Sequence, residues 1–175
     1  VFTARAVIGI DPSLNGTAVS MYQPGSVDCE MVLISLKSRK GLSESKKMMQ
    51  IYTFFKAPPT ADYFIEGMAF GVKYFHSSAA MIQGVIRVTI AASGLSVINL
   101  VPPTTLKMFV TGSGLSKKED MKLWVYKLWG QEFKTNDEVD AYALMMLGRY
   151  YLGHTDLPEL SEKRKECLTK ITQYV

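Results

Sequence analysis

Histidine and cysteine are scarce in this 175-residue sequence, which contains two of each. Cys29 and Cys167 lie far apart and form no CxxC pair, so they cannot build a disulfide framework. We expect both to be packing residues in a reducing compartment. His76 and His154 are expected at the surface.

Long apolar runs are also missing. No segment reaches the ~18 consecutive apolar residues that a membrane span needs, and Arg5 interrupts the first apolar stretch too early for a signal peptide. These absences predict a soluble, cytoplasmic protein. The net charge of +4 and the pI of about 9.0 favour a polyanionic partner, although many ordinary proteins share them. With 47% hydrophobic residues and no repeat or linker, residues 1–175 should form a single domain.

Apolar runs and turn signals predict an α/β domain. The expected strands are 4–10, 16–22, 29–36, 62–66 and 95–101, and the expected helices are 43–56, 77–93, 116–129 and 135–152. Met48, Ile51, Tyr52 and Phe55 would form the buried face of the first helix. "SKKE" (116–119) and "TNDE" (135–138) have the form of capping boxes. A last amphipathic segment, 161–175, should pack outside the rest.

Four acids occupy positions that need an explanation. Asp11 follows "AVIGI" and Glu66 follows "YFI", so both should lie at the carboxyl ends of central strands, where open α/β sheets place their sites. Asp137 and Asp140 are three residues apart and share one face of a helix. Taken singly, Asp11 or Glu66 could equally cap a helix or pair with a lysine, and Asp137 could be a first-turn acid favoured by the helix dipole.

If the four carboxylates converge, they suit a hard divalent cation. Mg²⁺ and Mn²⁺ prefer oxygen ligands, and the set contains no histidine or cysteine. Two such ions about 4 Å apart can activate water and stabilise the leaving oxygen at a phosphodiester. Metal-dependent phosphoryl chemistry is therefore one interpretation of the acids.

Three motifs, taken in order, resemble one family. "IGIDPSLNGTA", "YFIEGMAF" and "NDEVDAYALMMLG" are similar to the motifs of RuvC Holliday junction resolvases, within the ribonuclease H-like superfamily. The resemblance runs from about residue 7 to 151. It implies a ribonuclease H-like mixed sheet of five strands, three antiparallel and then two parallel, flanked by helices. It also implies that Asp11, Glu66, Asp137 and Asp140 are catalytic ligands of Mg²⁺ or Mn²⁺, two ions per site.

The basic segment "TTLKMFVTGSGLSKKEDMK" supports a phosphate-binding role. Lys117 and Lys118 are expected at a helix N-terminus, which already favours phosphate, although a solvated helix start would have the same composition. By the resemblance, Lys107 and Lys118 would be catalytic lysines that contact the DNA backbone near the cut. Such contacts set affinity without reading sequence.

The segment after Glu66, "GMAFGVKYFHSSAAMI", departs from the family pattern. Phe75 and His76 replace an asparagine that often stands before the Ser-Ala pair, and Gln83-Gly84 inverts the usual Gly-Gln order. The resemblance implies an aromatic that opens the junction centre: Phe70 first, then Tyr74 and Phe75, with Lys73 also on the DNA. The alternative is that Phe70 and Phe75 belong to the core or a dimer interface.

The resemblance also implies partners. The helix at 77–93 would form a twofold homodimer interface, because Met81, Ile82, Val85 and Ile86 are too many for one buried stripe. The expected substrate is a four-way DNA junction, resolved by paired symmetric nicks. A branch-migration helicase is a possible further partner, but no peptide motif indicates one. Two alternatives stay open: a broader branched or flap DNA nuclease of the same fold, and a nucleic-acid binding module that does not cut.

Overall fold

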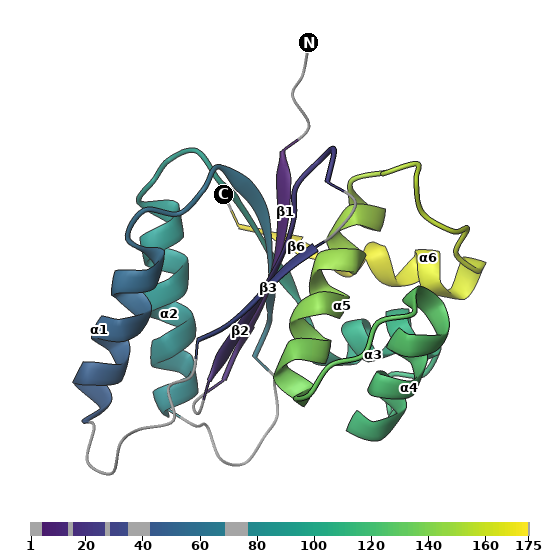
Figure 1. Ribbon diagram of the computed structural model, residues 1–175, viewed down its shortest axis with the longest axis horizontal. Helices are drawn as coiled ribbons and strands as arrows, with labels where there is room; N and C mark the ends of the chain where they lie inside the picture. Colours follow the sequence, from purple (N-terminus) through teal and green to yellow (C-terminus); the bar gives the residue numbers. More distant parts are fainter. Residues whose placement is uncertain (1–4, 14–15, 27–28, 35–42, 69–76, 175) are drawn as a thin grey trace.

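The computed structural model describes residues 5–13, 16–26, 29–34, 43–68 and 77–174 (Figure 1). The elements in chain order are β1 (Ala6–Pro12), β2 (Thr17–Tyr22), β3 (Cys29–Ile34), α1 (Glu44–Phe55), β4 (Ala61–Glu66), α2 (Ser77–Ala91), β5 (Val97–Val101), α3 (Pro103–Thr111), α4 (Lys118–Trp129), α5 (Asn136–Tyr151), α6 (Glu162–Leu168) and β6 (Thr172–Gln173). No helix within these ranges is long and apolar enough to cross a bilayer.

The sheet has the order β3-β2-β1-β4-β5-β6. The first three strands pair antiparallel, β4 pairs in parallel with β1, and β5 pairs in parallel with β4, as the family resemblance implies. The expected count of five strands was wrong by one. The segment 161–175, which we expected to pack outside the rest, also adds a strand to the sheet. Strand β6 pairs antiparallel with β5, and the Tyr174 amide donates to the Ile98 carbonyl at 2.7 Å. This short strand covers an edge of β5 that would otherwise be unpaired.

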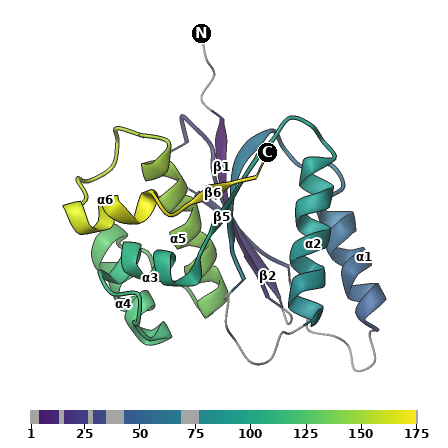
Figure 2. The ribbon, with the colours of Figure 1, turned by 180° about the vertical axis from the view of Figure 1, so that it is seen from behind.

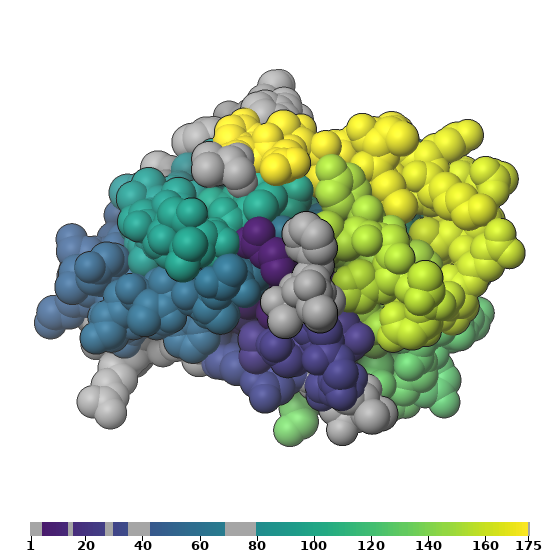
Figure 3. All heavy atoms as spheres, turned by 90° about the horizontal axis from the view of Figure 1, so that it is seen from above, coloured from purple at the N-terminus to yellow at the C-terminus, as the bar shows by residue number. Residues whose placement is uncertain are grey.

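Helices cover both faces of the sheet. Figures 1 and 2 show α1 and α2 on one side and α3, α4, α5 and α6 on the other, and Figure 3, seen from above, shows the two layers flanking β1. On α2, Ile82, Ile86 and Ile90 recur every four residues and are fully buried against the sheet. On α1, Ile51 and Phe55 are buried, but Tyr52, which the sequence placed on the same face, is 48% exposed.

Three local predictions have different outcomes. The capping box at 135–138 is confirmed: the Glu138 amide donates to the Thr135 hydroxyl, and the Thr135 amide donates to the Glu138 carboxylate. The box at 116–119 was wrong, because the Ser116 hydroxyl bonds to Thr111; α4 starts one residue later, and the Lys117 amide donates to Asp120. Helix α3 was not predicted.

Candidate active site

Asp11 and Glu66 lie side by side at one edge of the sheet. Asp11 is the penultimate residue of β1 and Glu66 is the last residue of β4. The two strands are parallel neighbours in a register that pairs Ile10 with Ile65, so their carboxyl ends coincide, at the lower end of the sheet in Figure 1. Both acids therefore lie at the carboxyl ends of central strands, as the sequence predicts.

Helix α5 brings the second pair of acids to the same edge. Its capped N-terminus places Asp137 in the first turn and Asp140 one turn further along. The helix lies unusually close to β1 at Gly9, because a Cβ there would overlap the carbonyl oxygen of Ala141 and the amide nitrogen of Met145. Gly148 makes a second close approach, where a Cβ would be 2.8 Å from Val7 Cγ1. Because glycine has no side chain at these two points, α5 can pack closely against the sheet, which places Asp137 and Asp140 beside β1.

Asp11 has the least favourable environment for a charge. It is only 6% exposed. Burial raises its pKa well above the usual value, and the negative charges of Glu66, Asp140 and Asp137 raise it further. A side-chain hydrogen bond with Glu66 raises the pKa of Asp11 further and opposes the rise in the pKa of Glu66.

Glu66 and Asp140 are half-buried and are perturbed in the same direction. Burial raises the pKa of Glu66 to about 7, with Asp140 adding to the rise and Asp11, Lys118 and Lys107 opposing it. Burial likewise raises the pKa of Asp140 to about 6, against the lowering effect of Lys118. With described residues, none of the four acids forms an ion pair within 4 Å. In the described residues, these carboxylates are therefore not neutralised by an ion pair with a neighbouring lysine.

Of the four predicted lysines, three lie in the described residues, and two of these act on the acidic edge. Lys107 lies on α3 and Lys118 is the first residue of α4, and both lower the pKa of Glu66 and of Asp140. Lys117 is the exposed N-cap of α4, and no shift of a carboxylate is traced to it. The ammonium groups of Lys107 and Lys118 therefore act on the carboxylates from beyond ion-pair distance.

Thr111 organises the turn between the two lysine-bearing helices. Its hydroxyl contacts the Lys107 carbonyl at 2.8 Å, the Ser113 carbonyl at 3.0 Å and the Ser116 hydroxyl at 2.6 Å. Gly112 then ends α3 with φ 81°. Sequence reasoning missed this role of Thr111, for which the only signal was its place before the glycine-containing turn.

Several predicted residues cannot be placed. Phe70, Lys73, Tyr74, Phe75 and His76 lie outside the described residues. His154, expected at the surface, is half-buried and packs edge-on against Tyr22 with ring centroids 5.5 Å apart. Cys167 is buried, as expected of a packing residue.

The donor set fits a hard divalent cation in its chemistry. The electrostatic repulsion that raises the carboxyl pKa values would be relieved by a cation, which favours the ionised oxygens as ligands. Among the described residues, however, no three acid, histidine or cysteine side chains are arranged closely enough to form a metal site as they stand. Side chains at the edge would have to close around the ion, and binding would favour their ionised forms.

The fold and the acidic edge define a class: an α/β protein with the ribonuclease H-like sheet and carboxylates at adjacent strand ends. The structure is similar to that of Thermus thermophilus RuvC, with a TM-score of 0.65 and 16% identity over 89% of this chain and 99% of that one. It is equally similar to T. thermophilus RuvC in complex with a Holliday junction substrate, with a TM-score of 0.66 and the same identity and coverage. The chain therefore has the RuvC-like fold that its motifs predict. No family model and no curated protein matches the sequence.

Proposed function

We propose that this protein is a metal-dependent endonuclease that resolves four-way DNA junctions by paired symmetric nicks. The observation that carries the proposal is the set of acids at one strand edge, where Asp11, Glu66 and Asp140 all have raised pKa values and act on one another. Such a cluster is costly for the fold, and perturbed carboxyl groups gathered at a strand end are typical of functional sites. The RuvC-like fold supports the choice of substrate.

Asp11, Glu66, Asp137 and Asp140 would hold Mg²⁺ or Mn²⁺, two ions in the full site. When bound, these ions supply the activation of water and the stabilisation of the leaving oxygen at the scissile phosphate. Asp11 is the most deeply buried of the three acids of this site with raised pKa values. Burial raises the pKa of Glu66 to about 7 in the absence of metal, and a bound cation would shift this carboxyl group toward its ionised, ligating form.

Lys107 and Lys118 would bind the DNA backbone beside the acids. Both lysines lie near enough to Glu66 and Asp140 to lower the pKa values of these acids. Neither lysine forms an ion pair within 4 Å with an acid among the described residues, so both ammonium groups can bind a phosphate. A phosphate placed between the lysines and a metal-loaded acidic edge would be neutralised from both sides. Lys117, at the exposed start of α4, is proposed as an outer backbone contact.

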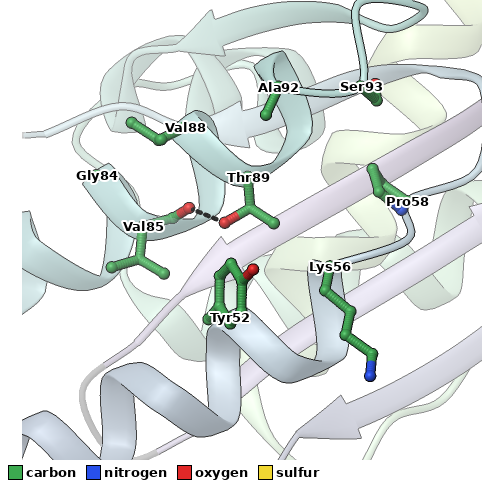
Figure 4. Close-up of a pocket in the computed structure, with 9 residues that line it drawn as sticks. All are labelled: Tyr52, Lys56, Pro58, Gly84, Val85, Val88, Thr89, Ala92 and Ser93. Carbon is green, nitrogen blue, oxygen red and sulfur yellow. Dashed lines mark hydrogen bonds between the residues drawn. The ribbon is translucent and has the colours of Figure 1, made fainter.

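A homodimer would give one active site for each strand to be cut. Helix α2 carries apolar side chains on its outer face as well as its inner one: Val88 is 70% exposed and Met81 is 42% exposed. A groove of about 470 Å³ runs between α1 and α2 and is lined by Tyr52, Gly84, Val85 and Val88 among others (Figure 4). Ile82 and Ile86, which the sequence also assigned to the interface, are fully buried in the core instead. The outer face of α2 supports pairing with a second copy.

The decisive experiment compares cleavage of a synthetic four-way junction with cleavage of duplex, flap and single-stranded DNA, in Mg²⁺ and in EDTA. We expect paired symmetric nicks on the junction that are lost in EDTA and in Asp11→Asn and Asp140→Asn, while junction binding survives. Glu119→Gln, which neutralises an exposed acid next to Lys118, is the matched control and should cut normally.

Other outcomes would separate the alternatives. Equal cutting of the flap would replace the proposal with a broader nuclease of the same fold. Tight binding without any cut, with Mg²⁺ or Mn²⁺ present, would indicate a binding module and overturn the catalytic role of the acids.

A further inference from the structure

Gln83 is a buried polar residue in an otherwise apolar part of α2. It is 5% exposed and lies beside Ile82, on a helix whose other deeply buried positions include Ile86 and Ile90. Burying an amide costs free energy unless its hydrogen bonds are replaced. The Gln83 Nε2 donates to the backbone carbonyl of Glu66 at 2.6 Å.

This hydrogen bond contacts β4 just beyond the last residue of β4 that pairs with β1. The pairing of β1 with β4 stops at Ile65, so Glu66 is the first β4 residue beyond it. On the β5 side, Glu66 still pairs with Val101, and the Gly67 amide donates to the Val101 carbonyl at 2.7 Å. Gln83 therefore supplies a contact from the helix layer to the residue that carries one of the four acids.

We propose that Gln83 is a positioning residue that holds the backbone of Glu66 so that its carboxylate faces the other acids. This inference rests on the proposed metal site and deepens it. The site is not closed around an ion as it stands, so the backbone from which Glu66 extends decides how readily its carboxylate can join. The same helix carries Val85 and Val88 of the outer groove, so the bond also connects Glu66 to the proposed subunit contact.

Asn99, on the neighbouring strand β5, provides a matched comparison. It is 1% exposed on β5, and its Nδ2 donates to the β4 carbonyl of Tyr63 at 3.3 Å. Both residues thus give a buried amide to the backbone of β4, but the Asn99 bond lies three residues before Glu66. A purely structural effect of losing such a bond should appear in both variants, whereas a positioning effect should appear only at Gln83.

The test measures the unfolding midpoint of the protein at increasing Mn²⁺ concentrations. The half-point is the Mn²⁺ concentration at which the midpoint has risen by half of its full metal-induced increase. We expect Gln83→Met to raise this concentration about 10-fold, as loss of groups that orient metal ligands commonly does. Asn99→Leu, which removes the bond to Tyr63 together with an amide oxygen that has no partner among the described residues, should leave the half-point unchanged whatever its effect on the midpoint. In a Glu66→Gln background, Gln83→Met should add little further increase, because the two residues act as a unit. Gln83→Asn, whose amide is too short to reach, should behave like Gln83→Met and serves if that variant does not fold.

The outcomes are distinguishable. A half-point in Gln83→Met equal to that of the wild type, or an increase that persists in full in the Glu66→Gln background, would overturn the role of Gln83 while leaving the metal site intact. Absence of any Mn²⁺-dependent rise in the wild type, or a rise that survives in Asp140→Asn, would overturn the proposed metal site itself and the role of Gln83 with it.

Discussion

Asp11 shows most directly what the site costs the protein. Its carboxyl group is buried, surrounded by three other acids, and bonded to one of them, so its charged form is disfavoured by both burial and repulsion. Glu66 and Asp140 share the same penalty to a smaller degree. Natural proteins commonly accept such a loss of stability at functional sites.

Stability without metal should therefore depend on pH through Asp140. Its pKa is raised from 3.8 to about 6 in the folded state, so the stabilising effect of protonation is complete below about 4 and is lost as pH rises through 6. In EDTA at pH 7.5, Asp140→Asn should be more stable than the wild type by roughly 1 to 3 kcal/mol, and this difference should disappear toward pH 4. Urea denaturation across this pH range measures it, with Glu132→Gln, an exposed acid, as the control. A difference independent of pH would contradict the assignment.

The lysines should contribute to DNA affinity through charge alone. Each phosphate contact releases counterions, so Lys107→Ala and Lys118→Ala should weaken junction binding and reduce the slope of log K against log salt by about 1 each. Binding titrations in Ca²⁺ or EDTA at several salt concentrations measure this slope. Lys46→Ala, an exposed lysine on α1 in the opposite helical layer, should leave the slope unchanged. An unchanged slope in Lys118→Ala would remove that lysine from the interface.

At the scale of elements, the seat of α5 on β1 decides where its two acids lie. The helix backbone meets the strand backbone at Gly9, and Gly148 accommodates the ring of Phe64 and the side chain of Val7. Val139, Leu144 and Leu147 on the same helix are buried in the core that it shares with α3, α4 and α6. A shift of α5 would move Asp137 and Asp140 away from Asp11 together.

Gly9→Ala should therefore damage both stability and site. The added methyl group meets backbone atoms of α5 that cannot move without the helix, so we expect a loss of unfolding free energy of about 3 kcal/mol or more. Gly84→Ala is the matched control: nothing lies within 4 Å of a Cβ there, and alanine in a helix should be neutral or stabilising by up to about 1 kcal/mol. Urea denaturation at fixed pH compares the two. If Gly9→Ala and the wild type had the same free energy of unfolding, the close packing of α5 against β1 at Gly9 would be contradicted.

At the scale of the whole molecule, the two helical layers differ in what they leave exposed. The layer of α3, α4, α5 and α6 carries Asp137, Asp140 and the two lysines that act on the acids, whereas the layer of α1 and α2 presents the apolar groove. A dimer through that groove would leave the acidic edge of each subunit accessible to DNA, since the edge lies at one end of the sheet rather than on the outer face of α2 (Figure 1).

Val88→Asp should convert a dimer to a monomer, because it places a charge in the centre of the apolar face of α2. Sedimentation velocity over a range of concentrations measures the change. Leu115→Asp is the matched control: Leu115 is 93% exposed, lies between α3 and α4, and should leave the dimer intact. A wild-type protein that stays monomeric at all concentrations, or a Val88→Asp variant that stays dimeric, would contradict the interface.

Most of the site could be predicted from local sequence patterns. Apolar runs that end in Asp11 and Glu66 indicate strand ends, and the capping box at Thr135 indicates where α5 begins. Helix α3 was missed because Pro102 and Pro103 directly follow β5 and indicate the end of a strand, although proline is also compatible with the first turn of a helix. Strand β6 was missed because its two residues become a strand only by pairing with β5.

The sequence by itself determined the longer strands and helices and the positions of the four acids at or near their ends, because helix and strand periodicities and caps are local properties of the chain. Only the tertiary structure decided which ends meet and what the meeting costs. Asp11 and Asp140 are far apart in sequence, and their mutual repulsion exists because β1, β4 and α5 pack at one edge. The hydrogen bond from Gln83 to Glu66 and the approach of α5 at Gly9 are likewise contacts between distant segments, and no local pattern encodes them.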